Sequence, residues 1–293
     1  MYHAGTGALC VGFAAAVLAE GGSQQPAPRF SGGVQLVEVH ATVTDGRGEP
    51  VTGLRQEDFE VYEDGRRQEV TAFAAGEVPL TVVVGVDRSW SMAGEPLRLA
   101  TRATEAFLDA LGPGDRSMVV AIGSDIEVLA PLSRDREAQR RAVAGLEPWS
   151  TTALHDAIVG ALDRLETEPG RRALVVFSDG VDRYSQASAA DVLDRARASQ
   201  VLVYPITLGR TAPSLAAELA VLTGGRSFLL RDARALETTF TAIARELRYQ
   251  YLLGYAAPDT DGAGGRPWRS IRVAITGDRP ALRVRARDGY YAD

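Results

Sequence analysis

The strongest fold signal in the sequence is the stretch Thr81-Val82-Val83-Val84-Gly85-Val86-Asp87-Arg88-Ser89-Trp90-Ser91-Met92. It opens with a short run of β-branched and apolar side chains, which is typical of a central strand covered by helices on both faces. The run ends in a carboxylate, Asp87, and hydroxyl groups follow at Ser89 and Ser91. Because ligands bind at the carboxyl ends of strands in open α/β sheets, we interpret this turn as part of a binding site.

Strands and helices alternate on the carboxyl-terminal side of this stretch. The alternation predicts an α/β domain over residues 78–248, with a doubly wound, mostly parallel sheet flanked by helices. Gly112-Pro113-Gly114 ends the first predicted helix. Further strands are predicted at 117–122, 126–129, 173–177, 201–207 and 227–230, and helices at 96–111, 134–146, 154–165, 189–199, 214–222 and 233–248.

Both flanks of this domain carry β patterns without helices between them. On the amino-terminal side we expect strands at 34–43 and 59–63, with a return at 70–73 across the hairpin signal Asp64-Gly65. On the carboxyl-terminal side we expect strands at 251–255, 270–275 and 282–286, with a Gly-rich loop at 259–266. The simplest arrangement is a small β-sandwich in which residues 31–76 and 249–293 pair with each other.

The amino terminus carries the one targeting pattern in the sequence. Residues 8–19 are almost wholly apolar but too short to span a bilayer, and they resemble the apolar region of a secretory signal. We therefore expect residues 1–30 to be a signal peptide and flexible linker, with export to the periplasm, the cell surface or the medium. The mature chain would then have no transmembrane span. The alternative is a disordered tail with no targeting role.

Composition limits the classes of function. Hydrophobic residues make up 45% and charged residues 24% of the 293 residues, as in ordinary globular proteins. The net charge of −6 argues against a general nucleic-acid binder, and all the basic residues are arginine. Cys10 is the sole cysteine, so disulfides cannot hold the fold. We interpret His40, which lies in a predicted strand, as a structural histidine.

Two further stretches supply oxygen atoms to the edge where Asp87 lies. Asp179 ends the second buried strand as Asp87 ends the first, and a hydroxyl-rich loop leads into a helix at residues 149–156. Neighbouring parallel strands would bring these groups together as two carboxylates and three hydroxyls. Hard divalent cations such as Mg²⁺ prefer oxygen ligands of this kind, and waters or a partner's oxygen can complete the shell.

These motifs resemble a known site. Asp87-x-Ser89-x-Ser91, then Thr152 followed by Ala153-Leu154, then Asp179-Gly180 resemble the metal-ion-dependent adhesion site of von Willebrand factor type A domains. The resemblance covers residues 78–248, and the flanks are similar to bacterial proteins related to this family. It implies a Mg²⁺ ion, with Mn²⁺ or Ca²⁺ as alternatives, held by a set of five side chains: Asp87, Ser89, Ser91, Thr152 and Asp179. It also implies a partner protein whose carboxylate completes the coordination shell.

The chain departs from the family pattern beside the ligands. Trp90 stands where glycine is common, and it either forms an exposed aromatic anchor or packs under a neighbouring loop. Thr151 is the alternative to Thr152 as the hydroxyl ligand. Asp182 either supports the ligands through hydrogen bonds or is a surface turn residue.

The leading hypothesis is a non-catalytic, metal-dependent protein-binding module. A structural or assembly protein that binds through the sandwich, with the metal only stiffening the loops, is the alternative. A magnesium-dependent phosphotransfer enzyme with Asp87 as nucleophile is a third reading, with Arg88 as the nearest cation for a phosphate. The sequence has no Gly-x-Ser-x-Gly elbow, P-loop or Gly-x-Gly-x-x-Gly motif to support other enzyme classes.

Overall fold

The structure is a computed structural model that describes residues 36–76, 78–257, 267–277 and 279–292. The predicted signal segment at 1–30, the first two residues of the predicted strand at 34–43 and the predicted loop at 259–266 lie outside the described residues. None of the helices within the described residues is long and apolar enough to cross a membrane.

A six-stranded sheet forms the centre of the α/β domain. Its strand order is β10-β9-β8-β5-β6-β7, and every neighbouring pair is parallel except β6 with β7. Every residue of β5 is buried, as the apolar run predicts for a central strand. The predicted fold class is confirmed. The strands are β5 (Leu80–Asp87), β6 (Arg116–Ile122), β7 (Ile126–Ser133), β8 (Arg171–Ser178), β9 (Leu202–Leu208) and β10 (Phe228–Leu230).

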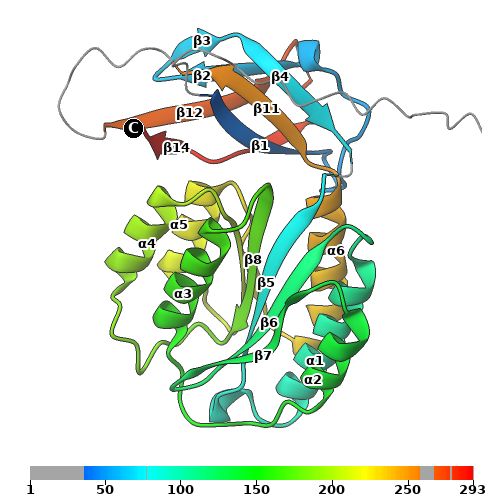
Figure 1. Cartoon of the computed structure of the whole chain (residues 1–293), viewed down its shortest axis with the longest axis vertical. Coiled ribbons are helices and arrows are strands. Elements are labelled where there is room, and N and C mark those ends of the chain that lie inside the picture. Colours follow the sequence, from blue (N-terminus) through cyan, green and yellow to red (C-terminus); the bar gives the residue numbers. More distant parts are fainter. Residues whose placement is uncertain (1–35, 77, 258–266, 278, 293) are drawn as a thin grey trace, which may run out of the picture. The chain divides into compact units, whose positions relative to one another are not determined.

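Helices cover both faces of this sheet (Figure 1). On one face lie α1 (Glu95–Ala110), α2 (Arg136–Ala144) and α6 (Leu236–Arg248); on the other lie α3 (Leu154–Glu166), α4 (Ala189–Ala198) and α5 (Ser214–Thr223). In α1 the buried residues recur at helical spacing, so one face of the helix packs on the sheet. Single turns of 3₁₀ helix occur at Gln56–Asp58, Trp90–Met92 and Ala233–Ala235.

The two flanks form a β-sandwich, as predicted, and each of its sheets takes strands from both ends of the chain. The first sheet has the order β13-β1-β11-β4 and the second β14-β12-β2-β3. Buried apolar side chains from both sheets share one core. The first sheet contains β1 (Leu36–Thr44), β4 (Val70–Ala75), β11 (Tyr251–Ala256) and β13 (Arg283–Arg285), and the second contains β2 (Phe59–Glu63), β3 (Arg66–Gln68), β12 (Trp268–Ile275) and β14 (Gly289–Tyr291).

The hairpin at Asp64-Gly65 is confirmed, but its return strand was predicted wrongly at residues 70–73. Asp64 and Gly65 both have positive φ, as a two-residue hairpin turn requires, and the turn pairs Glu63 directly with Arg66. The return strand is therefore β3, whereas β4 crosses to the other sheet and pairs with β11. Strand β14 was not predicted, and β7 continues to Ser133, four residues beyond its predicted end at Leu129.

A buried carboxylate joins the two sheets of the sandwich. Glu63 of β2 accepts hydrogen bonds from the hydroxyls of Tyr255 in β11 (2.7 Å) and Tyr290 in β14 (2.9 Å). Burial and the nearby Glu63 raise the pKa of both tyrosines, so both hydroxyls remain protonated donors. A buried acid needs such partners, and this network fixes the pairing of the sheets.

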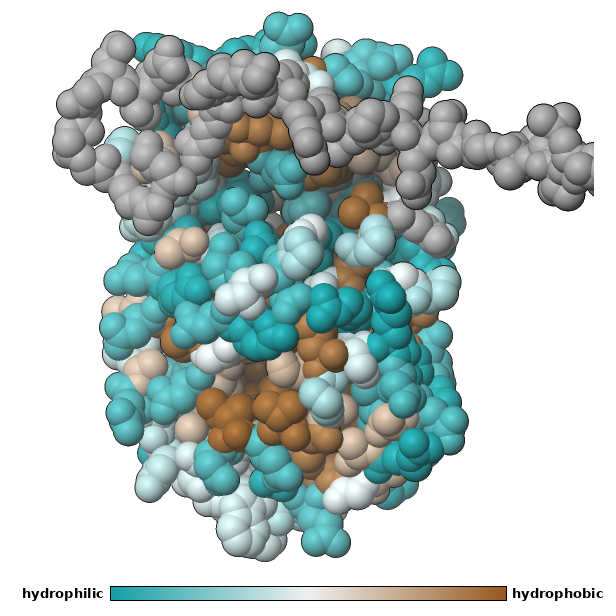
Figure 2. Space-filling view, in the orientation of Figure 1, coloured by the Kyte–Doolittle hydropathy of each residue, from teal (hydrophilic) through white to brown (hydrophobic). Residues whose placement is uncertain are grey.

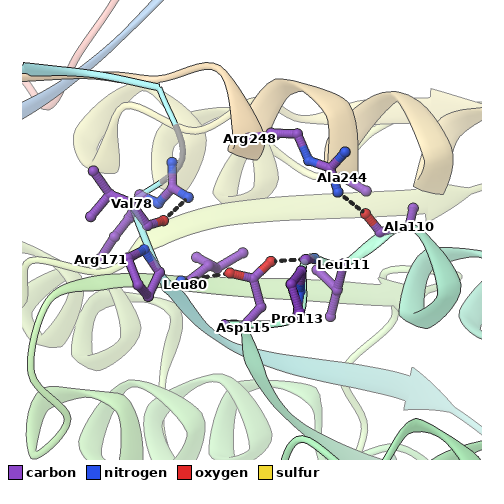
Figure 3. A pocket seen from close by; sticks show the side chains of 12 residues that line it. Val78, Leu80, Ala110, Leu111, Pro113, Asp115, Arg171, Ala244 and Arg248 are labelled. Atoms are coloured by element: carbon purple, nitrogen blue, oxygen red, sulfur yellow. Dashed lines mark hydrogen bonds between the residues drawn. The ribbon is translucent and has the colours of Figure 1, made fainter. Parts of the chain in front are cut away.

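At the amino-terminal end of β5, polar side chains hold backbone groups around a pocket of about 140 Å³ (Figure 3). The Asp115 carboxylate accepts from the amides of Leu80 (2.9 Å) and Gly112 (2.7 Å). Arg171 donates to the carbonyls of Val78 and Leu247, and Arg248 donates to the carbonyl of Ala110. The drawn bonds of this pocket go to backbone atoms, so these side chains fix chain segments at the end of the sheet opposite Asp87.

Apolar side chains are exposed along the edge strand β7. Ile126 and Val128 lie on the surface, and Figure 2 shows apolar atoms gathered over the part of the domain where Figure 1 draws β6 and β7. Pro131 within β7 lacks an amide hydrogen, which limits pairing along this edge.

His40 of β1 gives the fold a specific pH dependence. Burial first, and then the charges of Arg171, Arg172 and Arg287, lower the pKa of His40 from 6.5 to about 4. Between these pH values the unfolded chain binds a proton that the folded protein does not. The free energy of unfolding therefore falls as the pH drops from about 6.5 to about 4, and this contribution is constant below that range.

We expect the wild-type protein to lose about 2–3 kcal/mol over this pH range relative to His40→Gln, which has no titrating group at this position. Urea unfolding of both proteins at pH 7, 6, 5 and 4 measures the difference, because all other titrating groups are shared. A difference between the two proteins that stays constant from pH 7 to pH 4 would contradict this account of His40.

Candidate metal site at the carboxyl edge of the sheet

Strand register brings Asp87 next to Ser178. Val86 of β5 pairs with Phe177 of β8, so the residues that follow in each strand face each other at the carboxyl edge. The Ser178 hydroxyl donates to Asp87 Oδ2 at 2.6 Å, and the Ser89 amide donates to Asp87 Oδ1 at 2.8 Å. Each oxygen of the Asp87 carboxylate thus accepts one hydrogen bond, and together the two bonds fix the side chain.

Asp87 is fully buried (0% exposed), and its hydrogen-bond donors among the described residues carry no charge. Burial raises the pKa of Asp87, the hydrogen bonds from Ser178 and Ser89 oppose this rise, and the nearby charge of Asp179 adds to it. Within the described residues, the ion pairs do not include Asp87. Two carboxylates close to each other, one of them buried, favour the presence of a cation between or beside them.

Two serine hydroxyls lead from this carboxylate toward solvent. Ser89 is buried and Ser91 is exposed, and their Oγ atoms lie 3.0 Å apart. The turn of 3₁₀ helix at Trp90–Met92 sets this spacing, because Met92 is buried below it and its amide bonds to the Ser89 carbonyl. The three expected oxygen donors of this loop therefore run from the core to the surface.

The loop before α3 is fastened to the Asp87 loop by backbone hydrogen bonds. The amide of Trp149 donates to the Arg88 carbonyl (2.7 Å), and the amide of Trp90 donates to the Ser150 carbonyl (3.1 Å). Ser150 has a positive φ of 60°, which turns the chain so that Thr152 is buried while Thr151 is half-buried. The burial of Thr152 beside the fastened loop favours it over Thr151 as the inward-facing hydroxyl.

The third loop begins at Asp179, which is half-buried. Its Oδ1 accepts from the amide of Val181 (2.9 Å), and the amide of Gly180 donates to Ser178 Oγ (3.0 Å). Gly180 has a φ of +80°, and a Cβ there would lie 2.7 Å from Pro213 Cγ. Glycine is therefore required at this turn, and the turn fixes Asp179 at the strand end.

Two more acidic residues hold these loops together. Asp182 Oδ1 accepts from the amides of Leu154 (2.8 Å) and His155 (3.2 Å) and from the Ser185 hydroxyl (2.6 Å). The Asp156 carboxylate accepts from the amides of residues 186 and 187. Asp182 thus fixes the start of α3, two residues beyond Thr152.

Ser178 is the residue that the sequence analysis missed. It links Asp87 to the Asp179 turn, because its hydroxyl donates a hydrogen bond to the Asp87 carboxylate and accepts one from the amide of Gly180. A signal for it was present: Ser178 is a polar residue at the last position of a buried strand, directly before Asp179. Its role depends on the β5–β8 register, which the sequence alone does not specify.

The comparisons with known proteins identify the domain. The sequence profile of the family described as von Willebrand factor type A domain matches residues 82–181, which include all the predicted metal ligands. The chain contains a von Willebrand factor type A domain. Among curated proteins, none matches the sequence at a significant level.

Solved structures share the fold of the type A domain at low sequence identity. A von Willebrand factor type A protein from Catenulispora acidiphila is 18% identical with a TM-score of 0.54, and the match covers 90% of this chain and 65% of that one. The PilB minor pilin from Streptococcus sanguinis is 13% identical, with a TM-score of 0.51 and coverages of 59% and 62%. Proximal thread matrix protein 1 from the mussel byssus is 16% identical, with a TM-score of 0.51 and coverages of 63% and 49%. The chain thus spans less than two thirds of each of these three.

The donor set of the type A domain fits a hard cation. Among the described residues, no three side chains of His, Cys, Asp or Glu come together as a metal cluster. A cation here would instead bind two carboxylates, Asp87 and Asp179, together with hydroxyl oxygens. This composition suits Mg²⁺, which keeps several waters and few carboxylates in its shell.

Large aromatic side chains surround this edge of the type A domain. Trp90 is 65% exposed, Trp149 55% and Tyr184 63%, and the three lie on the loops that carry the predicted ligands. Trp90 therefore does not pack under a neighbouring loop. Exposed aromatic groups of this kind are typical of binding surfaces.

We expect Asp182→Ala to lower the free energy of unfolding by about 1–3 kcal/mol, because two amides at the start of α3 and one hydroxyl lose their acceptor. Asp194→Ala is the matched control, since it removes an exposed carboxylate that pairs with Arg197 on the surface of α4, and it should cost less than about 1 kcal/mol. Urea unfolding of both variants in EDTA measures the difference. Equal losses in the two variants would show that Asp182 does not hold the loops.

Proposed function

We propose that this protein is a non-catalytic, divalent-cation-dependent protein-binding module. Mg²⁺, or Mn²⁺ or Ca²⁺ in its place, would be held by the five predicted ligands, and an acidic side chain of a partner protein would complete the shell. When bound, the cation supplies an electrophilic position for a carboxylate, and the surrounding loops select the partner. The residues that would hold it are Asp87, Ser89, Ser91, Thr152 and Asp179.

The observation that carries this proposal is the burial of Asp87 among uncharged donors at the strand end. An ionised carboxylate without a cationic partner is costly to bury, and a bound cation would offset that cost. The loops on either side are joined by backbone hydrogen bonds, so their oxygen atoms are held in place before any ligand arrives. This arrangement supports a cation site more than a role in packing, because an apolar residue would pack at the end of β5 without this cost.

The aromatic rim supports a protein as the partner. Trp90, Trp149 and Tyr184 present large, rigid surfaces beside the predicted cation, and such side chains contribute much of the binding energy at protein interfaces. The backbone amides of both tryptophans donate the two hydrogen bonds that join the Asp87 loop to the loop before α3, so the positions of these two residues are fixed. A partner that places a carboxylate on the cation would therefore bring its neighbouring residues against these rings.

Groups that catalysis would need are engaged in structural contacts. His155 Nδ1 lies 3.0 Å from the Ala187 carbonyl oxygen, and Asp156 binds backbone amides. Arg88, the nearest candidate for holding a phosphate, pairs with Glu127 at 2.7 Å. These contacts favour a binding role over the phosphotransfer reading. The pilin and the byssus matrix protein that share this fold are in keeping with a binding role and with the export predicted from residues 1–30.

Selection of peptides from a displayed random library tests the proposal. The library is bound to the protein in Mg²⁺ and eluted with EDTA, so that only cation-dependent binders are recovered. We expect the eluted peptides to be enriched in Asp and Glu, flanked by apolar residues that contact the aromatic rim. Each peptide should bind at least tenfold more weakly to Ser91→Ala, which removes an exposed hydroxyl and leaves buried Asp87 untouched.

Ser124→Ala is the matched control, because this half-buried hydroxyl lies on a neighbouring loop outside the predicted ligand set. It should leave binding of the EDTA-eluted peptides unchanged. Recovery of binders that EDTA does not release, or of EDTA-sensitive binders without any acidic residue, would overturn the proposed function.

A further inference from the structure

A groove lined by arginines lies outside the loops that carry the predicted metal ligands. It is a groove of about 450 Å³ between the end of α5 with the loop into β10 and the sandwich strands β12 and β13. Fourteen residues line this basic groove; four are arginines and none is acidic. In a protein with a net charge of −6, a groove lined by positive charges alone is unusual. The arginines are Arg226, Arg272, Arg285 and Arg287.

The walls of the basic groove are held together by close backbone contacts. A Cβ at Gly224 would lie 2.5 Å from the amide nitrogen of Arg287 on the opposite wall, and one at Gly225 would lie 2.0 Å from the carbonyl oxygen of Val203 in β9, so the α5 wall is also packed on the sheet. The amide of Asp288 also donates to the Leu222 carbonyl at 3.4 Å. The chain after β13 is thus pressed against the end of α5, so the basic groove is formed before any ligand binds.

Two of the four arginines have structural partners. Arg285 pairs with the carboxylate of Glu246 in α6, which also accepts a hydrogen bond from Tyr204. Arg287 Nε donates to the Gly289 carbonyl at 2.6 Å. Their contacts explain why these two are retained at the junction of the sandwich and the α/β domain.

The other two arginines have no such role. The Arg226 guanidinium lies 4.7 Å from the ring centre of Phe228, and that of Arg272 lies 4.0 Å from the ring centre of Tyr62. Within the described residues neither forms an ion pair or donates a side-chain hydrogen bond. Stacking on a ring holds the planar guanidinium while its N–H groups remain able to bind a carboxylate. The two come from opposite walls of the basic groove.

Apolar side chains also line the basic groove. Val221 is 67% exposed on the α5 wall, and Val273 and Val284 are half-buried on the sandwich wall. A ligand that covers the basic groove must therefore carry both acidic and apolar groups. A phosphate backbone would leave the valines uncovered, so the chemistry favours an acidic peptide over a nucleic acid.

We propose that the basic groove binds an acidic, partly apolar peptide segment of a partner protein without a metal ion. Carboxylates of the peptide pair with Arg226 and Arg272, and its apolar side chains cover the valines that line the basic groove. This site is separate from the cation site: it has no carboxylate or hydroxyl cluster, and its binding persists in EDTA.

A fluorescein-labelled peptide of sequence Glu-Val-Glu-Leu-Glu-Val-Glu tests this proposal by fluorescence anisotropy in EDTA, which silences the cation site. We expect saturable binding that weakens as salt is added. Binding should be at least fivefold weaker in the Arg226→Gln/Arg272→Gln double variant, which keeps much of each side-chain stem. The matched control is Arg102→Gln/Arg134→Gln, which removes two exposed arginines outside the basic groove and should bind like the wild type.

Four results would overturn the proposal. The first two are no saturable binding by the folded wild-type protein and equal binding by the two double variants. The third is that a peptide with lysine in place of glutamate binds as tightly as the acidic peptide. The fourth is that a thymidine oligonucleotide displaces the labelled peptide at the same concentration as the unlabelled peptide does. Circular dichroism and urea unfolding show whether the double variant is folded. Because the assay contains EDTA, a negative result here does not contradict the proposed cation-dependent function. In the same way, failure of the peptide selection in Mg²⁺ does not contradict peptide binding in the basic groove.

Discussion

The burial of one carboxylate is the constraint on which the predicted binding edge depends. Asp87 ends a strand that is buried along its whole length, and its oxygens are fixed by the Ser178 hydroxyl and the Ser89 amide. Neither donor carries a charge, and Asp179 lies close enough to raise the pKa of Asp87 further. A fold that keeps two acids together in this way gains most from a cation that both can bind. The loops around them are correspondingly fastened by backbone and carboxylate hydrogen bonds.

Much of the fold could be predicted because its central strands are apolar on both faces. The runs ending at Asp87 and Asp179 mark β5 and β8, and the alternation of strands and helices gives a doubly wound sheet. The meeting of the flanks could also be inferred, since β segments on both sides of one α/β domain have few other partners. The structure confirms this arrangement in both sandwich sheets.

The missed features depend on register and tertiary pairing. The short strand β3 has no apolar residue, so its place opposite β2 follows from the Asp64-Gly65 turn and not from a hydrophobic pattern. Ser178 acquires its role only when β8 is placed beside β5 in the observed register. Asp156 reaches the backbone of a loop about thirty residues away along the chain. Contacts between distant segments are not encoded in local periodicity.

The two proposed recognition surfaces differ in their physical basis. At the sheet edge, acidic and hydroxyl oxygens would attract a cation, and the aromatic rim would select what binds it. In the basic groove, guanidinium groups are already positive and need no metal. Both favour acidic partners. Added salt should therefore weaken binding at both surfaces, whereas EDTA should weaken binding only at the cation site.

Anomalous X-ray diffraction from crystals of the protein grown with Mn²⁺ can show whether a cation lies at the carboxyl edge of the sheet. If the proposed site binds the cation, we expect one strong anomalous peak beside Asp87 and Asp179, with Ser89 Oγ and Ser91 Oγ within about 2.0–2.6 Å of it. Absence of a peak at this edge in crystals that hold Mn²⁺ elsewhere, or a peak bound only by surface carboxylates, would contradict the proposed site.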